Sequence, residues 1–516
     1  IIFAEWPGRS PQDVEDQLTY PLTSALLGLR KVKAVRGNYM FGFSSVHVIF
    51  EEGVDFYDSR TRLLEKLSSL RGGRDYPEGV RPQLGPEATA LGQVFWYTLE
   101  GRDARGRLTG GWDLEELRAV QDWYVRHALL SAEGVAEVAS VGGYVREYQV
   151  NLDPAAMRHF DVSLDDVRRA VRRSNLDVGA GTVEINRVEY FVRGVGFLEN
   201  VEDLRRAAVK TTDGVPVLLE QVAEVTTGPA PRRGALDRDG AEAVGGVVVA
   251  RFDANPMQVI EAVKERIERI EPGMARKVVL DRERAGPDAP RAYARRHGFE
   301  AYVDGRLHQS AWLAHLEGLA PDQRPEWARL SKVTIVPFYD RSELIVETLG
   351  TLERALRDQM LLTFLVVVIL LLHLRSSLLI GSMLPLAVGL TFVAMRLVGV
   401  DANIVALSGI AIAIGTIVDM GIVLCENILR HLDEAPPGGS RLAVVHRGAT
   451  EVGGAILTAA MTTVIGFLPV FALTGKAGKL FRPLAFTKTF ALVASAVIAL
   501  TVLPSAAWLL LRGRRG

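Results

Sequence analysis

Hydrophobic residues near the end of the chain form long runs, whereas earlier residues alternate between polar and apolar over short distances. The apolar runs lie near residues 360–374, 378–398, 404–425, 455–473 and 484–511. Each approaches or reaches the roughly 20 residues that a helix needs to cross a bilayer. Pro385, Gly415, Pro469 and Pro504 interrupt them, and membrane helices tolerate such residues better than soluble helices do. The pattern predicts an all-α bundle of five membrane-spanning helices within residues 346–516.

The part of the chain before residue 346 has the short elements of a mixed α+β fold. Strand patterns at 1–5, 34–39 and 44–51, with helical patterns at 11–27 and 57–70, give the order strand, helix, strand, strand, helix. This is the order of a split βαβ, ferredoxin-like unit. A similar order recurs in strands 94–99, 136–141, 245–252 and 333–337 with helices 114–130 and 256–270. The sequence therefore predicts two such α+β units.

Two segments interrupt the second unit. Residues 144–233 have helical and strand patterns of their own and are predicted to form an inserted subdomain. Residues 282–330 are rich in Arg, Ala, His and Pro, and are expected to form an irregular insertion. The predicted domains are 1–93 for the first unit, 94–143 and 234–345 for the two parts of the second, 144–233 for the inserted subdomain, and 346–516 for the membrane helices.

Composition excludes several classes of function. The chain has 60 Lys and Arg against 61 Asp and Glu, so no basic excess is available to bind a nucleic acid. A single cysteine in 516 residues excludes a disulfide framework and a cysteine-rich metal site. No nucleotide-binding loop appears, and neither a cofactor nor an enzymatic activity is expected. The chain begins without Met or a signal-type segment, which favours a fragment of a larger protein.

Basic residues in the short loops predict the orientation of the membrane helices. The loops after the first and third runs, together with the tail, hold Arg375, Arg430, Arg441, Arg447, Arg512, Arg514 and Arg515. The opposite loops and helix ends hold Arg396, Lys476, Lys479 and Arg482. The larger set is predicted to be cytoplasmic. The region before the membrane helices would then be periplasmic, with the helices in a bacterial inner membrane.

The third apolar run contains two carboxylates, Asp419 and Glu426. An ionised Asp in the hydrocarbon region costs roughly 2.5–3.5 kcal/mol on insertion scales. Because a low dielectric disfavours the charged form of a carboxyl group, Asp419 is a candidate to bind and release a proton. Glu426 lies two helical turns later, about 10 Å along the same face. The hypothesis is a proton relay through both residues; the alternatives are a structural salt bridge for Asp419 and a membrane-surface position for Glu426.

Other candidate residues have weaker functional signals. Lys488 is a possible polar partner of Asp419, although anchoring at the membrane interface or a structural pairing is the favoured alternative. Cys425 is expected to be a small buried apolar residue. Three imidazoles in the 282–330 insertion can in principle bind a transition metal, but their spacing fits no compact ligand motif and favours an exposed loop. These residues are His297, His308 and His315.

The segment from Asp419 to Asn427 resembles the fourth transmembrane helix of the resistance–nodulation–division exporters, which has an acidic residue, an Ile/Val stretch and Glu-Asn. Other segments resemble the heavy-metal efflux branch of this superfamily. They are Trp6-Pro-Gly-Arg-Ser-Pro, Gln17-Leu-Thr-Tyr-Pro-Leu-Thr, Val138-Ala-Ser-Val-Gly-Gly, Phe338-Tyr-Asp-Arg-Ser and Leu480-Phe-Arg-Pro-Leu-Ala-Phe-Thr-Lys-Thr. Together the matches cover nearly the whole chain in order.

The resemblance implies twelve membrane spans and two large periplasmic regions, of which this chain would be the first half without its first span. The two α+β units would be porter subdomains, and residues 144–233 a docking subdomain. The protein would export heavy-metal cations in exchange for protons, as a homotrimer with a periplasmic adaptor and an outer-membrane channel. The resemblance also places a lysine partner of Asp419 in the other half, so the chain alone is expected not to transport.

Three departures from the family pattern leave the metal open between copper or silver and zinc, cobalt, nickel or cadmium. Met420 follows Asp419 where drug exporters usually have a second acid. Ala413 stands where divalent-cation members typically have a further Asp. The methionines of the copper and silver members are replaced at three aligned positions, Val405, Ile417 and Leu424. An exporter of small hydrophobic compounds and a non-transporting membrane protein that docks partners are the alternative functions.

Overall fold

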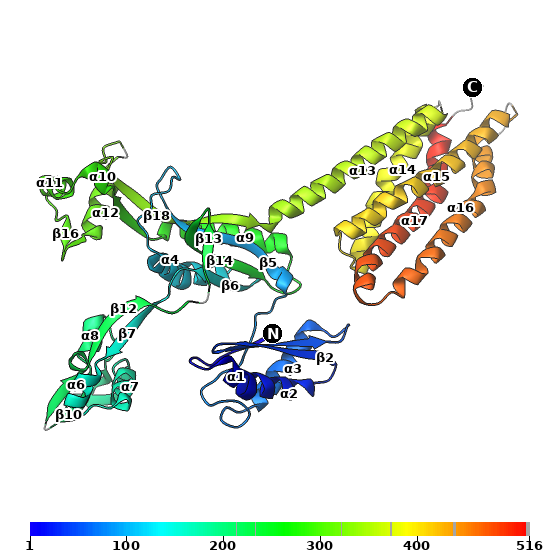
Figure 1. The fold of residues 1–516 in the computed structure, drawn as a ribbon. Coiled ribbons are helices and arrows are strands. Elements are labelled where there is room, and N and C mark those ends of the chain that lie inside the picture. The colour runs from blue at the N-terminus through cyan, green and yellow to red at the C-terminus, as the bar shows by residue number, and fades with distance from the viewer. Residues whose placement is uncertain (213, 233, 321, 372–373, 437–439, 512–516) are drawn as a thin grey trace. The chain divides into compact units, whose positions relative to one another are not determined.

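The computed structural model describes residues 1–212, 214–232, 234–320, 322–371, 374–436 and 440–511. The chain divides into two compact units, Pro86–Ser342 and a second unit made of Ile1–Gly85 and Glu343–Gly516. Figure 1 shows the helices and strands of each part. The parts before residue 341 are mixed α/β, and the parts after it are helical. The predicted combination of a mixed α/β region with long apolar helices is confirmed.

Residues 1–85 form an antiparallel sheet with helices on it. The strands are β1 (Ile2–Glu5), β2 (Val32–Met40), β3 (Phe43–Phe50) and β4 (Gln83–Leu84), in the spatial order β2-β3-β1-β4. The helices are α1 (Pro11–Val14), a π-helical turn (Glu15–Thr19), α2 (Tyr20–Leu27) and α3 (Phe56–Ser69). Ile2 and Val46 from the sheet pack against Leu18, Leu22 and Leu63 from the helices. Up to α3, the elements follow the predicted order of strand, helix, strand, strand, helix.

A second antiparallel sheet is built from segments that are far apart in the sequence. Its order is β13 (Leu236–Arg238), β14 (Ala241–Ala250), β5 (Gln93–Arg102), β18 (Ala328–Asp340) and β15 (Arg276–Leu280), with β6 (Val135–Gly142) also paired to β14. Its core includes residues of α4 (Leu114–Val120), a π-helical turn (Gln121–Val125), α5 (Arg126–Leu130) and α9 (Pro256–Ile270). β15 and the first part of β18 are absent from the sequence prediction.

The segment between β6 and β13 has a hydrophobic core of its own. Its strands are β7 (Arg146–Leu152), β8 (Val178–Ile185), β9 (Val188–Gly194), β10 (Ala208–Thr212), β11 (Val215–Leu218) and β12 (Ala223–Pro229). Its helices are α6 (Pro154–His159), α7 (Leu164–Arg173) and α8 (Val201–Arg205). β7 pairs with β12, and Val167, Leu204, Leu219 and Val222 are buried together. The segment therefore has its own core and is inserted in the sequence between two strands of the larger sheet.

Residues 282–327, which we call the inserted module, are folded, and the prediction of an irregular insertion is wrong. The module contains α10 (Arg282–Ala285), α11 (Ala289–Arg296), the hairpin β16 (Tyr302–Val303) and β17 (Arg306–Leu307), and α12 (Gln309–Glu317). Trp312 and Leu316 are fully buried in its core. The Trp312 indole Nε1 donates a hydrogen bond to the carbonyl of Ala301, at 3.1 Å. The helices have only four, eight and nine residues, which is too short for a helical period to reveal this core in the sequence.

Deletion of the inserted module is expected to leave the sheet intact, because the two ends of the module lie side by side. The backbone N–H of Asp281 donates to the carbonyl of Trp327, at 2.8 Å. A short Gly linker that replaces residues 284–325 should therefore preserve the pairing of β15 with β18. The melting temperature should fall only modestly, since Val278 and Ala328 lose part of their cover. Circular dichroism and thermal unfolding of the purified deletion variant test this, and loss of the folded protein would show that the module is required for the sheet.

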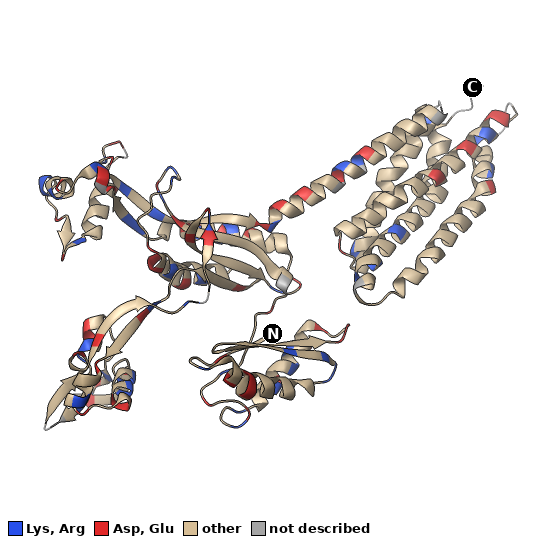
Figure 2. Cartoon of the chain, viewed as in Figure 1, with Lys and Arg blue, Asp and Glu red and all other residues tan. Residues whose placement is uncertain are grey.

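The membrane region contains α13 (Arg341–Leu371), α14 (Leu374–Val398), α15 (Ile404–Glu434), α16 (Arg441–Phe471) and α17 (Gly475–Leu510). Among the described residues, four helices are long and apolar enough to cross a membrane, and they lie within α14, α15, α16 and α17. Figure 2 shows how sparse charged residues are along these helices. The fifth predicted span, 360–374, stays a prediction, because its described part is the end of α13 and residues 372–373 lie outside the description. Arg512, Arg514 and Arg515 of the orientation argument also lie outside it.

α15 and α17 run in the same direction and pack closely. The Thr487 hydroxyl donates to the carbonyl of Ala406 at 2.7 Å, and further along Ser495 Oγ lies 3.3 Å from Met420 Sδ. A Cβ atom at Gly409 would lie 2.8 Å from the carbonyl oxygen of Leu484, so the close approach requires glycine there. The backbone of α15 thus touches α17 because one side chain is missing.

Replacing Gly409 with alanine is expected to separate α15 from α17 and destabilise the helix bundle by about 1–3 kcal/mol, the usual range for overpacking. Gly389→Ala in α14 is the matched control, because a Cβ atom there meets no atom within 4 Å. Thermal unfolding of both variants in detergent measures the difference. Equal melting temperatures for the two alanine variants would contradict the packing described here.

Candidate functional site

One face of α15 is exposed in this chain, and it carries both predicted carboxylates. The exposed residues recur every three or four positions, as one side of a helix does. We call them the α15 stripe: Ile412, Gly415, Asp419, Val423 and Glu426. Most of the remaining residues between Ala406 and Ile428 are buried, the greater part of them against other membrane helices. Asp419 and Glu426 therefore lie on the same unpacked face, as their spacing predicts.

The glycines of α15 have different surroundings, depending on whether they lie on the stripe. Gly409 and Gly421 approach other helices, and a Cβ atom at Gly421 would lie 3.1 Å from Met383 Sδ. Gly415 has open space around its Cα instead, so it contributes nothing to close packing within the described residues. Gly415 lies one turn before Asp419, so no side chain projects from the stripe at that turn.

Within the part of the chain that the structure describes, Asp419 and Glu426 have no hydrogen-bonding or ion-pair partner. Lys488 does not reach Asp419. Its ammonium group packs over the ring of Phe467, 4.2 Å from the ring centroid. The contacts of Thr487 with Ala406 and of Ser495 with Met420 place Lys488 roughly 9–18 Å from Asp419 along the helix axes. Within the described residues, Lys488 forms no ion pair with Asp419.

A polar cluster next to Glu426 was not foreseen from the sequence. The buried Asn427 amide donates to the carbonyl of Gly448 at 2.8 Å and to the carboxylate of Glu451 at 3.2 Å. His431 Nε2 lies 2.5 Å from the same carboxylate, and Arg430 lies 3.5 Å from it. Glu451 lies four residues before the apolar run predicted at 455–473, which is why it was not paired with α15. The cluster fixes the end of α15 against α16.

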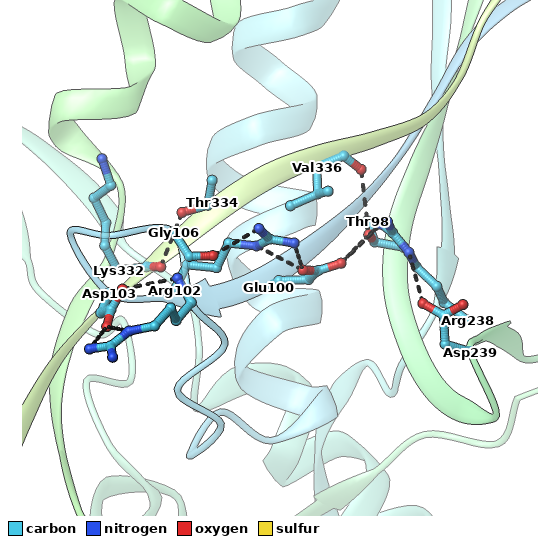
Figure 3. A network of polar contacts seen from close by, with 11 residues as sticks. Thr98, Glu100, Arg102, Asp103, Gly106, Arg238, Asp239, Lys332, Thr334 and Val336 are labelled. Atoms are coloured by element: carbon cyan, nitrogen blue, oxygen red, sulfur yellow. Dashed lines mark hydrogen bonds and ion pairs between the residues drawn. The ribbon is translucent and has the colours of Figure 1, made fainter.

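Figure 3 shows a carboxylate in the second sheet that is fully engaged by neighbouring side chains. Glu100 on β5 accepts from Arg102 at 2.7 Å and lies 2.9 Å from the guanidinium of Arg238. The Thr98 hydroxyl donates to it as well, at 3.0 Å. Two guanidinium groups surround one carboxylate, so Glu100 is a structural counter-ion between β5 and β13 rather than a cation ligand.

The candidate metal ligands have two different outcomes. Cys425 is fully buried among apolar residues of the helix bundle, as predicted. His297 and His315 are brought together in the inserted module, with ring centroids 4.8 Å apart, whereas no ring contact links His308 to either. Among the described residues, no group of three or more His, Cys, Asp and Glu side chains is arranged to hold a metal ion. The ligands of any transported cation stay unassigned.

Comparison with known proteins identifies the family. Residues 1–283 and 329–516 match the family model described as the AcrB/AcrD/AcrF family. The chain belongs to this family. The predicted relationship to resistance–nodulation–division exporters is confirmed. The interval between the two matched ranges, 284–328, coincides with the inserted module to within two residues, so the family model does not account for most of this module.

The relatives named below are cation efflux or metal resistance proteins. The putative cation efflux system protein SilA of Salmonella typhimurium is 36% identical over 100% of this chain and 44% of its own length. The cation efflux system protein CusA of Escherichia coli K12 has the same identity and coverage. The cobalt-zinc-cadmium resistance protein CzcA of Cupriavidus metallidurans is 28% identical over 97% of this chain and 42% of its length.

A solved structure agrees with the sequence relatives. The crystal structure of a heavy metal efflux pump matches 98% of this chain and 44% of its own chain, with a TM-score of 0.77 and 25% identity. The chain spans less than half the length of the relatives it matches.

Proposed function

We propose that the chain is part of a proton-driven exporter of heavy-metal cations in the bacterial inner membrane. The observation that carries the proposal is the 36% identity, over all of this chain, to proteins named for cation efflux. The long apolar helices α14–α17 supply the membrane region that such a pump needs. Under this proposal a proton gradient drives transport, so the protein would be a secondary transporter and not an enzyme.

Asp419 is the residue that we assign to proton binding, with Glu426 next on the same face. Protonation of Asp419 removes one of the two carboxylate charges of the stripe, which changes how that stripe packs against another helix. Two packings of α15 that differ in this proton can drive a conformational cycle. α13 is one continuous helix from Arg341 into the apolar region. Because it joins the membrane helices to the preceding α/β region, it would transmit such a movement between them.

The α15 stripe is proposed to pack against the part of the exporter that this chain does not cover. An apolar helix face with two carboxylates requires a partner that satisfies them, because an ionised carboxylate in the bilayer is costly. Lys488 packs over Phe467 and forms no ion pair with Asp419 within the described residues. We infer that a basic side chain from the uncovered part faces Asp419.

The wider assembly follows the same family proposal. Residues 1–93 and the two parts of the second unit, 94–143 and 234–345, would be porter subdomains, and residues 144–233 a docking subdomain. They would lie in the periplasm of a homotrimer that works with a periplasmic adaptor and an outer-membrane channel. The distribution of Arg and Lys in the short loops supports this orientation.

A resistance profile tests the proposal. It uses cells that produce the transport-competent protein, by which we mean this chain together with the part of the exporter that it does not cover. Copper, silver, zinc, cobalt, nickel and cadmium salts are compared with a panel of small hydrophobic compounds. Raised tolerance to one or more of the metals, without raised tolerance to the organic compounds, is the expected result. Tolerance to the organic compounds alone would replace heavy metals with hydrophobic substrates. Unchanged tolerance throughout would favour a protein that only docks partners.

A further inference from the structure

The inserted module holds two histidines on a rigid aromatic base. His297 is the residue directly after α11, and His315 lies in the last turn of α12. Trp312, fully buried, stacks with Tyr293 and meets Phe299 edge to face, with centroid distances of 5.8 and 4.9 Å. The ends of α11 and α12 are thereby fixed relative to each other. The imidazole of His297 is exposed and that of His315 is partly buried, so the pair lies at the surface of the module.

The distance between the two rings suits a shared metal ion. A nitrogen of an imidazole bound to a transition metal lies about 2.0–2.1 Å from the metal, so two imidazoles on one tetrahedral ion have centroids about 5 Å apart. The observed separation of the His297 and His315 centroids is 4.8 Å, with an angle of 46° between the rings. The separation of the two rings therefore matches that of two imidazoles on one metal ion.

Tyr293 provides the support that metal-binding histidines usually have. Its hydroxyl oxygen lies 3.2 Å from His315 Nε2. If Nε2–H donates to this oxygen, the proton is held on Nε2 and the lone pair of Nδ1 is left for a metal. The same contact holds the ring of His315 in place beside His297.

We propose that His297 and His315 of the inserted module bind one borderline transition-metal ion, such as Cu(II), Zn(II) or Ni(II), with Tyr293 as a positioning residue. Imidazole is a preferred ligand of these ions. The exposed side of the pair leaves coordination positions for water. The site lies outside the residue ranges that match the family model, and it does not depend on the proposed export function.

Binding of Cu(II) to the purified full chain in detergent tests the proposal without any transport assay. Equilibrium dialysis gives the number and affinity of bound ions, and electron paramagnetic resonance detects the coordinated nitrogens. The wild-type chain is expected to bind one Cu(II) with two imidazole nitrogens. His297→Gln and His315→Gln should each weaken binding at least tenfold. Tyr293→Phe should weaken it less and keep the two-nitrogen signal, since loss of such a supporting contact typically costs about 10–100-fold at most.

His127→Gln is the matched control. His127 lies on α5, is exposed, and is next to the ring of Trp123 in the preceding π-helical turn. This variant should bind Cu(II) as the wild type does. The proposal is overturned if the wild type binds no more Cu(II) than the double variant His297→Gln/His315→Gln, or if both single variants keep wild-type affinity. Should His315→Gln fail to fold, the exposed His297 decides the question alone.

Discussion

Replacing Asp419 with asparagine is expected to abolish metal tolerance while the protein stays folded and inserted. The two side chains have nearly the same shape, and only the titratable proton is lost. Asp419 is exposed on the α15 stripe and forms no hydrogen bond or ion pair within the described residues. The variant should therefore reach wild-type levels in the membrane. Growth on metal salts, with protein abundance measured in parallel, gives the result.

Glu426→Gln is the graded comparison for this experiment. Glu426 lies two turns further along the same stripe, close to the polar cluster of Asn427 and Glu451, where water can replace it. Its loss should reduce tolerance less than loss of Asp419 does. Wild-type tolerance in the Asp419→Asn variant at normal abundance would remove Asp419 from the proton path.

Residues 1–516 produced alone are expected to give no metal tolerance. The α15 stripe would face lipid with two carboxylates that lack a counter-charge within the described residues. Production together with a chain that corresponds to the uncovered length of the relatives should restore tolerance. The measurement is growth of metal-sensitive cells that express each chain separately and both together.

Val423→Ala on the stripe and Val445→Ala, in the buried core of the bundle, form a matched pair for this assay. Val423→Ala should reduce the metal tolerance that the second chain restores. Val445→Ala should instead lower the stability of residues 1–516 produced alone. Tolerance from residues 1–516 alone would show that the site is self-contained, and the paired arrangement would then be wrong.

The membrane helices and the α+β elements were predictable because single, local patterns specify them. Long apolar runs located α14 to α17, although the helices continue past those runs, as α15 does to Glu434. Polar residues at these ends carry no hydropathy signal and can still be helical. Asp419 and Glu426 were found on one face because seven residues make two turns of a helix.

The inserted module and the Glu451 cluster could not be predicted, because they depend on contacts between distant segments. Trp312 is buried by Phe299, Tyr293 and Trp327, and none of these forms a period with it in the sequence. His297 and His315 are eighteen positions apart and meet only because two short helices fold back. The position of Lys488 relative to Asp419 depends on the register of α17 against α15, which hydropathy does not specify.

Metal flux in proteoliposomes that contain the transport-competent protein tests the central claim most directly. A pH gradient, acidic inside, is imposed, and uptake of the metal identified by the resistance profile is followed with and without an uncoupler. Uptake is predicted to require the gradient in the wild type and to be absent in Asp419→Asn at equal reconstitution. Gradient-dependent uptake that persists in Asp419→Asn would contradict a proton-driven metal exporter that works through this residue.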